Sequence, residues 1–589
     1  MVKKLSPALK GSKSKKSKSF PKKSKSATKK SKSASKKSKS TSKKGKSTSK
    51  KGTRGNKSVK TASPIVASSP LPPSPSSSVV VTQTSAATDK GGVKRQRLLQ
   101  KGRGVVDPFS GKADSCHVYE NGEDLYQCTL NQTNISSNNN KYYILQLLEP
   151  DHGGPYYVFT RWGRVGISGQ NKTECFSNVQ DAVRSYCKKF YEKTRNCWSN
   201  RANFKKVEGQ YYLMDIDYGA EEVEKKDSAQ VKKKKKMEKK EVVESALPKE
   251  LQYLMRLIGN KDNMTQTMRE LDINTDQMPL GKISKPQILR AYEVLKGLEK
   301  ELKKPRPKLE EMSGQFYTLI PHVFGNRKPP VIDSMSMLRK KMEMLETLGE
   351  LEIAATLLET NETEGMHPLD SAYKSLNCEI RPLPQSDPAF KRIVEYASNT
   401  QGLTHNSYTL EVTNVFTVKR EGEEKRFKSF KKLGNRQMLW HGSRVTNFMG
   451  ILSQGLRIAP PEAPSTGYMF GKGIYLADVC SKSANYCYPA KDTKTGLMLL
   501  CEAALGKQEE LYSAQYMEKP VSGKNATKGV GRMYPDPAGA EVVDGILWPK
   551  GKLIVNDEIK THLIYPEHII YDVGQCTLRY LVMVKFCYK

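Results

Sequence analysis

The distribution of charge along this chain limits what it can fold into more than any other feature. Residues 1–104 carry 30 Lys and Arg side chains against one acidic residue, Asp89, whereas the rest of the 589 residues is close to balanced. This segment has a single aromatic residue, Phe20, and long Lys-Ser runs, so it cannot bury enough apolar surface to offset the entropy of ordering it. We therefore expect residues 1–104 to form a disordered basic tail.

The basic tail indicates which partners suit the chain. A dense positive charge attracts polyanions, so the tail is expected to bind DNA, RNA or another acidic polymer, although a purely solubilising or localising role stays open. An anionic membrane is disfavoured because no apolar face accompanies the charge, and no stretch approaches the roughly 18 apolar residues of a membrane span. The cluster Lys94–Arg97 fits import into the nucleus, and the N-terminus has no apolar leader segment.

The cysteines argue against a metal site and against a disulfide framework. The sequence has 11 of them, and they are scattered without a Cys-x-x-Cys pair. This spacing supports neither a zinc finger nor a secreted scaffold, so we expect no metal, a reducing compartment and mostly packing roles for the thiols.

Hydrophobic patterning divides the rest of the chain into an α+β multidomain protein. Residues 115–215 are aromatic-rich, with strands predicted at 141–148 and 156–166 around a Gly-Gly-Pro turn, and with a helix predicted from Val179. A charged linker over 216–245 follows. Leu and Met residues then recur at helical spacing, which predicts an all-helical bundle over residues 246–362. Residues 366–589 are predicted to form a β-rich mixed domain, whose last strand alternates apolar residues from Leu578 to Phe586.

Three segments of the last domain carry candidate chemistry. They are LWHGSR at residues 439–444, a 33-residue run at 455–487 that includes MFGKGIYLADVCSKSANYC, and LIYPEHIIYD at 563–572. Taken singly, His441 could be a core histidine, Tyr475 a packing residue and Glu567 the cap of a turn. No Gly-x-Gly-x-x-Gly follows a predicted strand, so a Rossmann dinucleotide site is not indicated.

Together and in this order, the three segments resemble the catalytic domain of the poly(ADP-ribose) polymerase family, with its His-Tyr-Glu triad. Residues 404–412 and 420–427 match as well, and the resemblance runs from about Ser115 to the C-terminus. It implies an ADP-ribosyltransferase fold and an enzyme that takes NAD+ as ADP-ribose donor and releases nicotinamide. Such a reaction passes through a cation-like sugar, so the site must hold its substrate rigidly and stabilise positive charge.

The resemblance also implies a role for each matched residue. His441 would bond the adenosine ribose, and Gly442 and Ser443 the nicotinamide carboxamide. Tyr475 and Tyr486 would sandwich the nicotinamide ring. Glu567 would be the catalytic carboxylate, and in this family it marks chain elongation. The remaining implied NAD+ contacts are Gly450, Arg457, Tyr468 and Ser483, and Lys482, Met469 and His405 match positions on the acceptor side.

This chain departs from the family pattern at a few positions of the site. Pro566 and His568 flank Glu567 where relatives usually carry Asn and Tyr, and Leu476 replaces the usual Phe. These differences bear on chain length and acceptor preference rather than on the reaction.

The helical segment resembles the regulatory domain that precedes the catalytic domain in DNA-dependent family members. The matching stretches lie at residues 247–258, 277–284 and 316–325. The resemblance implies that this domain blocks NAD+ entry until DNA loosens it. The acidic residues Glu343, Glu346 and Glu350 would face the NAD+ cleft; relatives carry Asp at the last two positions. Gly349 should weaken this helix by roughly 1 kcal/mol, so basal activity is expected to be less tightly suppressed.

The sequence RWGRVG at Arg161–Gly166 resembles the WGR domain of the same proteins. Without its neighbours, it would indicate only a turn with a buried tryptophan. By resemblance, Trp162 packs on a sugar or base at a strand end and Arg164 pairs with a terminal phosphate, while Asn140 and Tyr211 contact the backbone. Such contacts recognise broken ends without base sequence. Zinc-finger and BRCT patterns are absent, as in the small nuclear members of the family.

The sequence therefore predicts a nuclear poly(ADP-ribose) polymerase activated by DNA strand breaks. Expected acceptors are the protein itself and chromatin proteins such as histones, and an accessory factor that completes the site for serine modification stays open. Two alternatives remain. The enzyme could add single ADP-ribose units, against which Glu567 argues, or the chain could be a catalytically silent chromatin-binding protein.

Overall fold

The computed structural model describes residues 100–101, 103–217, 244–273, 282–359, 365–465, 467–489 and 493–589, all within one compact unit that spans residues 93–589. Residues 1–99 of the expected tail and 218–243 of the expected linker lie outside this part. Gln100–Lys101 (β1) pairs with Gly104–Val105 (β2), and Arg103 Nε lies 2.8 Å from Glu120 Oε2. The last residues assigned to the tail therefore belong to the fold.

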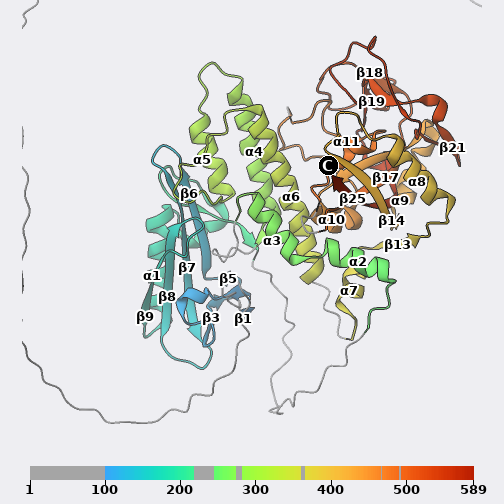
Figure 1. Cartoon of the computed structure of the whole chain (residues 1–589). Helices are drawn as coiled ribbons and strands as arrows, with labels where there is room; N and C mark the ends of the chain where they lie inside the picture. Colours follow the sequence, from blue (N-terminus) through green and yellow to red (C-terminus); the bar gives the residue numbers. More distant parts are fainter. Residues whose placement is uncertain are drawn as a thin grey trace, which may run out of the picture. The chain divides into compact units, whose positions relative to one another are not determined.

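The first domain is an antiparallel sheet with one helix packed against it (Figure 1). The strand order is β10-β6-β7-β8-β9, and β3 also pairs with β7. The predicted hairpin is confirmed: β7 (Asn139–Pro150) pairs with β8 (Tyr156–Arg164), and Gly153 and Gly154 between them take positive φ angles of 77° and 135° that favour glycine. The predicted helix is α1 (Val179–Thr194). The other strands are β3 (Cys116–Val118), β4 (Glu120–Asn121), β5 (Asp124–Leu125), β6 (Gln127–Asn134), β9 (Gln170–Phe176) and β10 (Tyr212–Leu213).

The predicted bundle is confirmed, although it is not entirely helical. Its helices are α2 (Lys249–Ile258), α3 (Lys261–Glu270), α4 (Lys285–Leu302), α5 (Leu309–Leu319) and α6 (Met335–Glu359). Local signals set some of these boundaries, since the Ser284 side chain accepts a hydrogen bond from Gln287 N at the start of α4. The exception is β12 (Lys282–Ile283), which pairs with β11 (Ile216–Asp217). Such long-range pairing leaves no periodic trace in a two-residue segment.

The C-terminal domain contains two main sheets. One is ordered β13-β14-β25-β17-β15-β22-β21 and the other β16-β24-β19-β18. Its strands are β13 (Cys378–Leu383), β14 (Tyr408–Arg420), β15 (Arg436–Ser443), β16 (Ile474–Leu476), β17 (Thr495–Ala504), β18 (Gln508–Leu511), β19 (Ala526–Gly529), β20 (Met533–Pro535), β21 (Glu541–Val543), β22 (Ile546–Trp548), β23 (Leu553–Val555), β24 (Glu567–Ile570) and β25 (Cys576–Tyr588). Its helices are α7 (Pro368–Ser375), α8 (Pro388–Asn399), α9 (Glu423–Lys428), α10 (Phe448–Gln454) and α11 (Cys480–Ala484).

The last strand, β25, is buried on both faces rather than on one. It lies between β14 and β17, so side chains of both parities are covered: Val582 and Val584 pack in one core, and Leu581 and Met583 in another. The alternation from Leu578 to Phe586 is therefore only part of a nearly continuous apolar run, as expected for a central strand.

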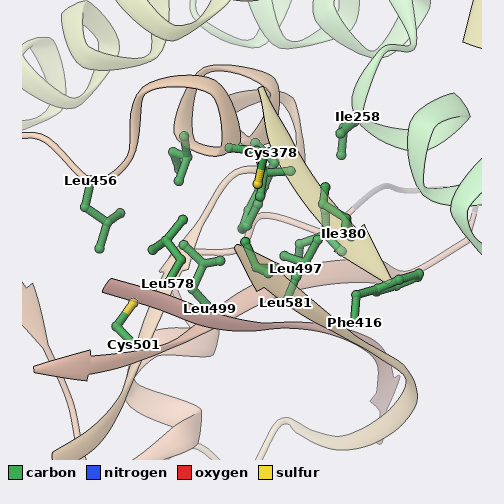
Figure 2. Packing of buried hydrophobic residues seen from close by; sticks show 14 of the residues in the cluster. Ile258, Cys378, Ile380, Phe416, Leu456, Leu497, Leu499, Cys501, Leu578 and Leu581 are labelled. Atoms are coloured by element: carbon green, nitrogen blue, oxygen red, sulfur yellow. The ribbon is translucent and has the colours of Figure 1, made fainter. Parts of the chain in front are cut away.

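One hydrophobic core joins the helical bundle to the C-terminal domain. Ile258 of α2 belongs to the same cluster as Cys378 and Ile380 of β13 and Leu497 of β17 (Figure 2). The bundle has a second core, which includes Leu338 and Leu345 of α6. Helix α6 thus contributes to two cores, because Ala354 near its C-terminal end lies in the first cluster. This shared packing positions α6 against the domain that holds the candidate site.

Candidate active site

The strands of the C-terminal domain bring the three triad residues together. His441 lies near the end of β15, Tyr475 in β16 and Glu567 at the start of β24. Strand β15 is joined to β16 through the bridge between Trp440 and Ala477, and β16 is paired with β24, with Tyr475 opposite Ile569. Because side chains alternate along a strand, Tyr475 and Glu567 lie on the same face of this sheet.

His441 is oriented by the strand that carries Tyr475. Its Nδ1 lies 3.0 Å from the carbonyl oxygen of Tyr475, and burial lowers the pKa of the imidazole. A carbonyl only accepts, so a neutral ring places its proton on Nδ1 and leaves Nε2 as an acceptor. This orientation suits a hydrogen bond from a ribose hydroxyl.

The Tyr475 ring is held by its own hydroxyl group. The hydroxyl donates to the Gly471 carbonyl at 2.8 Å and accepts from Phe470 N at 3.0 Å, and burial raises its pKa. The Tyr468 ring centroid lies 6.4 Å from that of Tyr475. Tyr486 is 55% exposed. A fixed ring at Tyr475 and an exposed one at Tyr486 are the kind of surfaces on which a planar ligand can stack.

The backbone of α11 lies so close to β15 that the site needs a glycine at position 442, and two serines lie near this contact. A side chain at Gly442 would overlap the carbonyl oxygen of Ser483, so α11 can lie against β15 only if this residue is glycine. Ser443 Oγ accepts a hydrogen bond from Asn447 Nδ2 at 3.0 Å, and Ser483 is 5% exposed. The residues predicted to bind a carboxamide therefore gather at one end of β15.

Glu567 is paired with a lysine of α11. Lys482 Nζ lies 2.8 Å from Glu567 Oε1 and donates to the carbonyls of Tyr565 and Pro566 at 3.0 Å each. Burial lowers the pKa of Lys482, although Glu567 opposes this effect. His405 lies near Lys482: burial lowers the pKa of the His405 imidazole, and the positive charge of Lys482 lowers it further. Met469 is 41% exposed. A carboxylate held in place by a lysine is suited to stabilising positive charge on a sugar.

The α6 carboxylates reach the predicted adenosine side of the site. Glu350 is 6% exposed and forms an ion pair with the Arg457 guanidinium. A side chain at Gly450 would overlap Glu350 Oε2, which has no hydrogen-bond partner among the described residues. Glu350 thus lies against both residues predicted to line the adenosine pocket, as expected for an obstructing helix.

Glu346 and Glu343 lie one and two helical turns before Glu350. Both side chains are exposed to solvent, yet the surrounding protein atoms raise both pKa values, that of Glu346 to about 7 with a further contribution from Glu350. Burial is also the largest cause of the raised pKa of Glu350, opposed by Arg457. The docked helix therefore gathers carboxylates that favour protonation.

Glu346 gives a pH-dependent test of this docking. If undocking returns the Glu346 pKa toward its ordinary value, the docked state binds more protons, so docking weakens as pH rises from about 4.5 to about 7. We expect Glu346→Gln, which cannot ionise, to slow amide hydrogen exchange of α6 about three- to tenfold at pH 8 and to slow it less at pH 5. Comparison with wild type at each pH cancels the intrinsic exchange rate.

The control for this measurement is Glu293→Gln on α4, whose side chain is exposed. Equal protection of α6 in wild type and Glu346→Gln at pH 8 would show that Glu346 does not destabilise the docked helix.

The helical domain also forms hydrogen bonds with residues 461–465 of the C-terminal domain, a contact that the sequence did not predict. Glu299 of α4 accepts a hydrogen bond from Ser465 N at 2.8 Å, and Lys296 donates to the Pro461 carbonyl at 2.8 Å. Ala463 between them lies in the core of the bundle. The available signal was Glu299 itself, an acidic residue at a helical position where the spacing from Tyr292 and Leu295 calls for an apolar one.

Two of the four residues predicted to contact DNA lie on an aromatic and basic surface of the first domain. Trp162 stacks on Tyr143, with centroids 6.0 Å apart and an angle of 19°, and Tyr211 lies 6.0 Å from the same ring. Lys193 lies 4.8 Å above Tyr143 and Lys141 5.2 Å above Tyr211, whose pKa burial raises to about 12. Rings and cations alternating in this way suit a nucleic acid end.

The other two residues lie at the contact with the helical domain. Asn140 is 1% exposed and donates to the His322 carbonyl at 2.8 Å. Arg164 donates to the carbonyls of Gly325, Arg327 and Asn138, the last two at 2.8 Å. Here Arg164 therefore binds the protein's own carbonyls, and its predicted phosphate contact stays a prediction. The sequence could not reveal these two contacts, because Asn140 and Arg164 donate to backbone carbonyls there.

Among the residues that the structure describes, no cluster of His, Cys, Asp and Glu has the arrangement of a metal site, and the eleven cysteines are free. Among the described helices, none combines the length and apolar character needed to cross a bilayer.

Comparison with known proteins identifies three matching segments. Family models match residues 126–205 as a WGR domain, residues 245–373 as a poly(ADP-ribose) polymerase regulatory domain, and residues 388–586 as a poly(ADP-ribose) polymerase catalytic domain. The three matches follow the order of the sheet domain, the helical bundle and the C-terminal domain.

Individual relatives align over most of the chain. Poly(ADP-ribose) polymerase 2 of Homo sapiens is 43% identical over 498 residues, covering 83% of this chain and 84% of the relative. Poly(ADP-ribose) polymerase 2-A of Oryza sativa subsp. japonica is 44% identical over 474 residues, covering 80% and 71%. Poly(ADP-ribose) polymerase 1 of Gallus gallus is 43% identical over 500 residues, covering 84% of this chain and 48% of the relative. The chain thus spans about half the length of the polymerase 1 relatives.

Proposed function

This chain belongs to the poly(ADP-ribose) polymerase family, a family of ADP-ribosyltransferases, and we propose that it builds ADP-ribose chains on proteins when it meets broken DNA. The observation that carries the proposal is the gathering of His441, Tyr475 and Glu567 on neighbouring strands, together with the contact of Glu350 of the helical domain with Gly450 and Arg457. A catalytic group and an obstructing helix at one site are what a regulated transferase requires.

NAD+ fits the residues of this site as the ADP-ribose donor. His441 Nε2 is oriented to accept from a ribose hydroxyl, and the Gly442 backbone with the Ser443 hydroxyl would hold the carboxamide. Gly450 offers a surface without a side chain on the adenosine side, where Glu350 now lies. No metal ion is required for these contacts.

Glu567 would act on the ribose rather than on the nicotinamide. Its carboxylate, fixed by Lys482, can polarise a ribose hydroxyl and favour the positive charge that develops as the bond to nicotinamide breaks. The same carboxylate would orient the hydroxyl of a growing chain, so polymer is favoured over single units. We propose nuclear localisation, modification of the enzyme itself and of chromatin proteins such as histones, and a role in DNA repair. An accessory factor would supply any group missing for serine acceptors.

One assay separates these possibilities. Nicotinamide release is measured with and without nicked DNA, and the products are run on a denaturing gel. Release that depends on DNA and gives a polymer ladder supports the proposal. Release with single units only would favour a mono-ADP-ribosyltransferase, and no release under any condition would favour a silent chromatin-binding protein.

Replacing Arg164 tests how DNA binding reaches the catalytic domain. We expect Arg164→Ala to remove most of the stimulation by broken DNA and to leave basal turnover unchanged, because the guanidinium links β8 to residues 325–327 of the helical domain. If Arg164 also binds a phosphate, the slope of log K against log salt falls by about 0.9.

The control is Arg184→Ala, an exposed arginine of α1 whose ion pair is with Asp181. Lost stimulation with an unchanged salt slope assigns coupling alone to Arg164, whereas equal stimulation in wild type and variant would reject both roles.

The basic tail, of which residues 1–99 lie outside the described part of the chain, is proposed to anchor DNA and to accept ADP-ribose on its serines. Each unit adds two phosphate charges, so a modest polymer would outweigh 30 basic residues and drive release from the break. We expect a chain starting at Gln100, which keeps the pairing of β1 with β2, to stay on DNA after automodification more than the full chain does. The difference in DNA release between the full chain and the shortened chain should shrink above physiological salt. Unmodified serines in residues 1–60 with equal release would contradict this role.

A further inference from the structure

A buried pair of ionisable side chains lies directly behind the proposed catalytic carboxylate. His568 follows Glu567 in β24 and is 2% exposed, and its Nε2 lies 3.5 Å from Oδ2 of Asp478. Asp478 is 7% exposed, and its Oδ1 has no hydrogen-bond partner among the described residues. A buried carboxylate depends strongly on the partner that compensates its charge.

The His568 ring is fixed from its other side as well. Gln508 of β18 places its side-chain Nε2 3.1 Å from Nδ1 of His568. An amide NH2 group donates and does not accept, so Nδ1 is the acceptor and a ring proton lies on Nε2. Nε2 carries this proton 3.5 Å from Asp478 Oδ2 and has no hydrogen-bond partner among the described residues, so Asp478 is the polar group that faces it behind β24.

Asp478 lies next to helix α11, which carries Lys482, the partner of Glu567. It lies two residues before α11, and its charge opposes the effect of burial on the pKa of Lys482 in that helix. Lys482 in turn lies 2.8 Å from Glu567 Oε1. Because adjacent residues of a strand face opposite sides, β24 contacts the α11 segment twice, through Glu567 on one face and through His568 on the other.

We propose that His568, through Asp478, is a positioning residue that fixes Glu567 for the transfer step. Glu567 is the first residue of β24, so pairing continues on only one side of it along the strand. A displacement of about 1 Å in a reacting group can cost about 100-fold in rate. The contact of His568 with Asp478, which fixes the start of β24, therefore controls turnover. This inference rests on the function proposed above.

The first test separates turnover from NAD+ binding. We expect His568→Leu to lower kcat for elongation about tenfold and to leave KM for NAD+ within about twofold, because the predicted donor contacts His441, Gly442 and Ser443 lie in β15 and not in β24. Asp478→Asn, which keeps the shape of the carboxylate, should have the same effect on kcat. It replaces the leucine variant as the test if that variant folds poorly. His568→Gln, which keeps a polar N–H group in place of the ring, should recover most of kcat.

Rates are normalised to folded sites by titration with an inhibitor of the nicotinamide pocket. The control is His562→Leu, the same substitution at an exposed histidine of the same domain. Normal kcat in both His568→Leu and Asp478→Asn would overturn the proposal.

A double variant decides whether His568 acts through Glu567. In the Glu567→Gln background, adding His568→Leu should change the residual rate of nicotinamide release less than twofold, about the error of such a comparison. Effects that multiply would show that His568 supports the fold at large and would overturn the positioning role. If the wild-type chain released no nicotinamide, the proposed function itself would fail, and this inference with it. An active wild type with unaffected variants removes the inference alone.

Discussion

Replacing Glu567 by Gln is expected to lower polymer formation by about 10²- to 10⁴-fold while NAD+ still binds. The substitution removes the negative charge but keeps the shape, and the new carbonyl oxygen can still accept from Lys482, which lies 2.8 Å from the present carboxylate. The donor contacts are left in place, because His441, Gly442 and Ser443 belong to β15 and not to β24.

Two measurements check this result. Polymer is followed on a denaturing gel, and NAD+ affinity is measured by titration calorimetry with a non-transferable analogue. Glu558→Gln, at an exposed acid of the same domain, controls for the loss of one negative charge. Long chains made by the Glu567 variant would show that the transfer step uses another group.

The sequence predicted elements where a repeating pattern reports local structure. The hairpin at residues 141–166 combines apolar strands with turn glycines, and the helix from Val179 has apolar residues at helical spacing; both are confirmed. The grouping of His441, Tyr475 and Glu567 could be anticipated only from the family motif, since 126 residues of sequence separate the first from the last. Their proximity is produced by pairing of β16 with β24, which no spacing reveals.

Contacts between domains were beyond what the sequence could predict. Arg164 and Asn140 donate to backbone carbonyls of the helical domain, and any residue type supplies a carbonyl. Glu299 was visible as an acid in an apolar stripe, but its partner, Ser465 N, was not. The pairing of His568 with Asp478 joins positions 90 residues apart through side chains that are unremarkable in the sequence.

Deleting residues 247–358 is expected to raise the rate without DNA by about 10- to 100-fold, which corresponds to a docked state populated at roughly 90 to 99% in the intact chain. The physical reason is the position of Glu350, which lies against Gly450 and Arg457 on the adenosine side. Removing α6 clears that pocket, so the remaining enzyme has no obstructed state for DNA to relieve. Nicotinamide release with and without nicked DNA measures the effect.

The shared core makes a second variant necessary for this prediction. Deletion removes α2, so the apolar residues Cys378 and Ile380 lose the cover that Ile258 provides, and the product can lose stability for that reason alone (Figure 2). Glu350→Ala keeps α2 and frees only the pocket, so it should raise basal activity in the same direction and lower KM for NAD+. Glu352→Ala, on the same helix, should do neither. A folded deletion variant and a Glu350 variant that both remain silent without DNA would mean that α6 does not gate the site, whereas activation by both isolates the carboxylate at Gly450 as the obstruction.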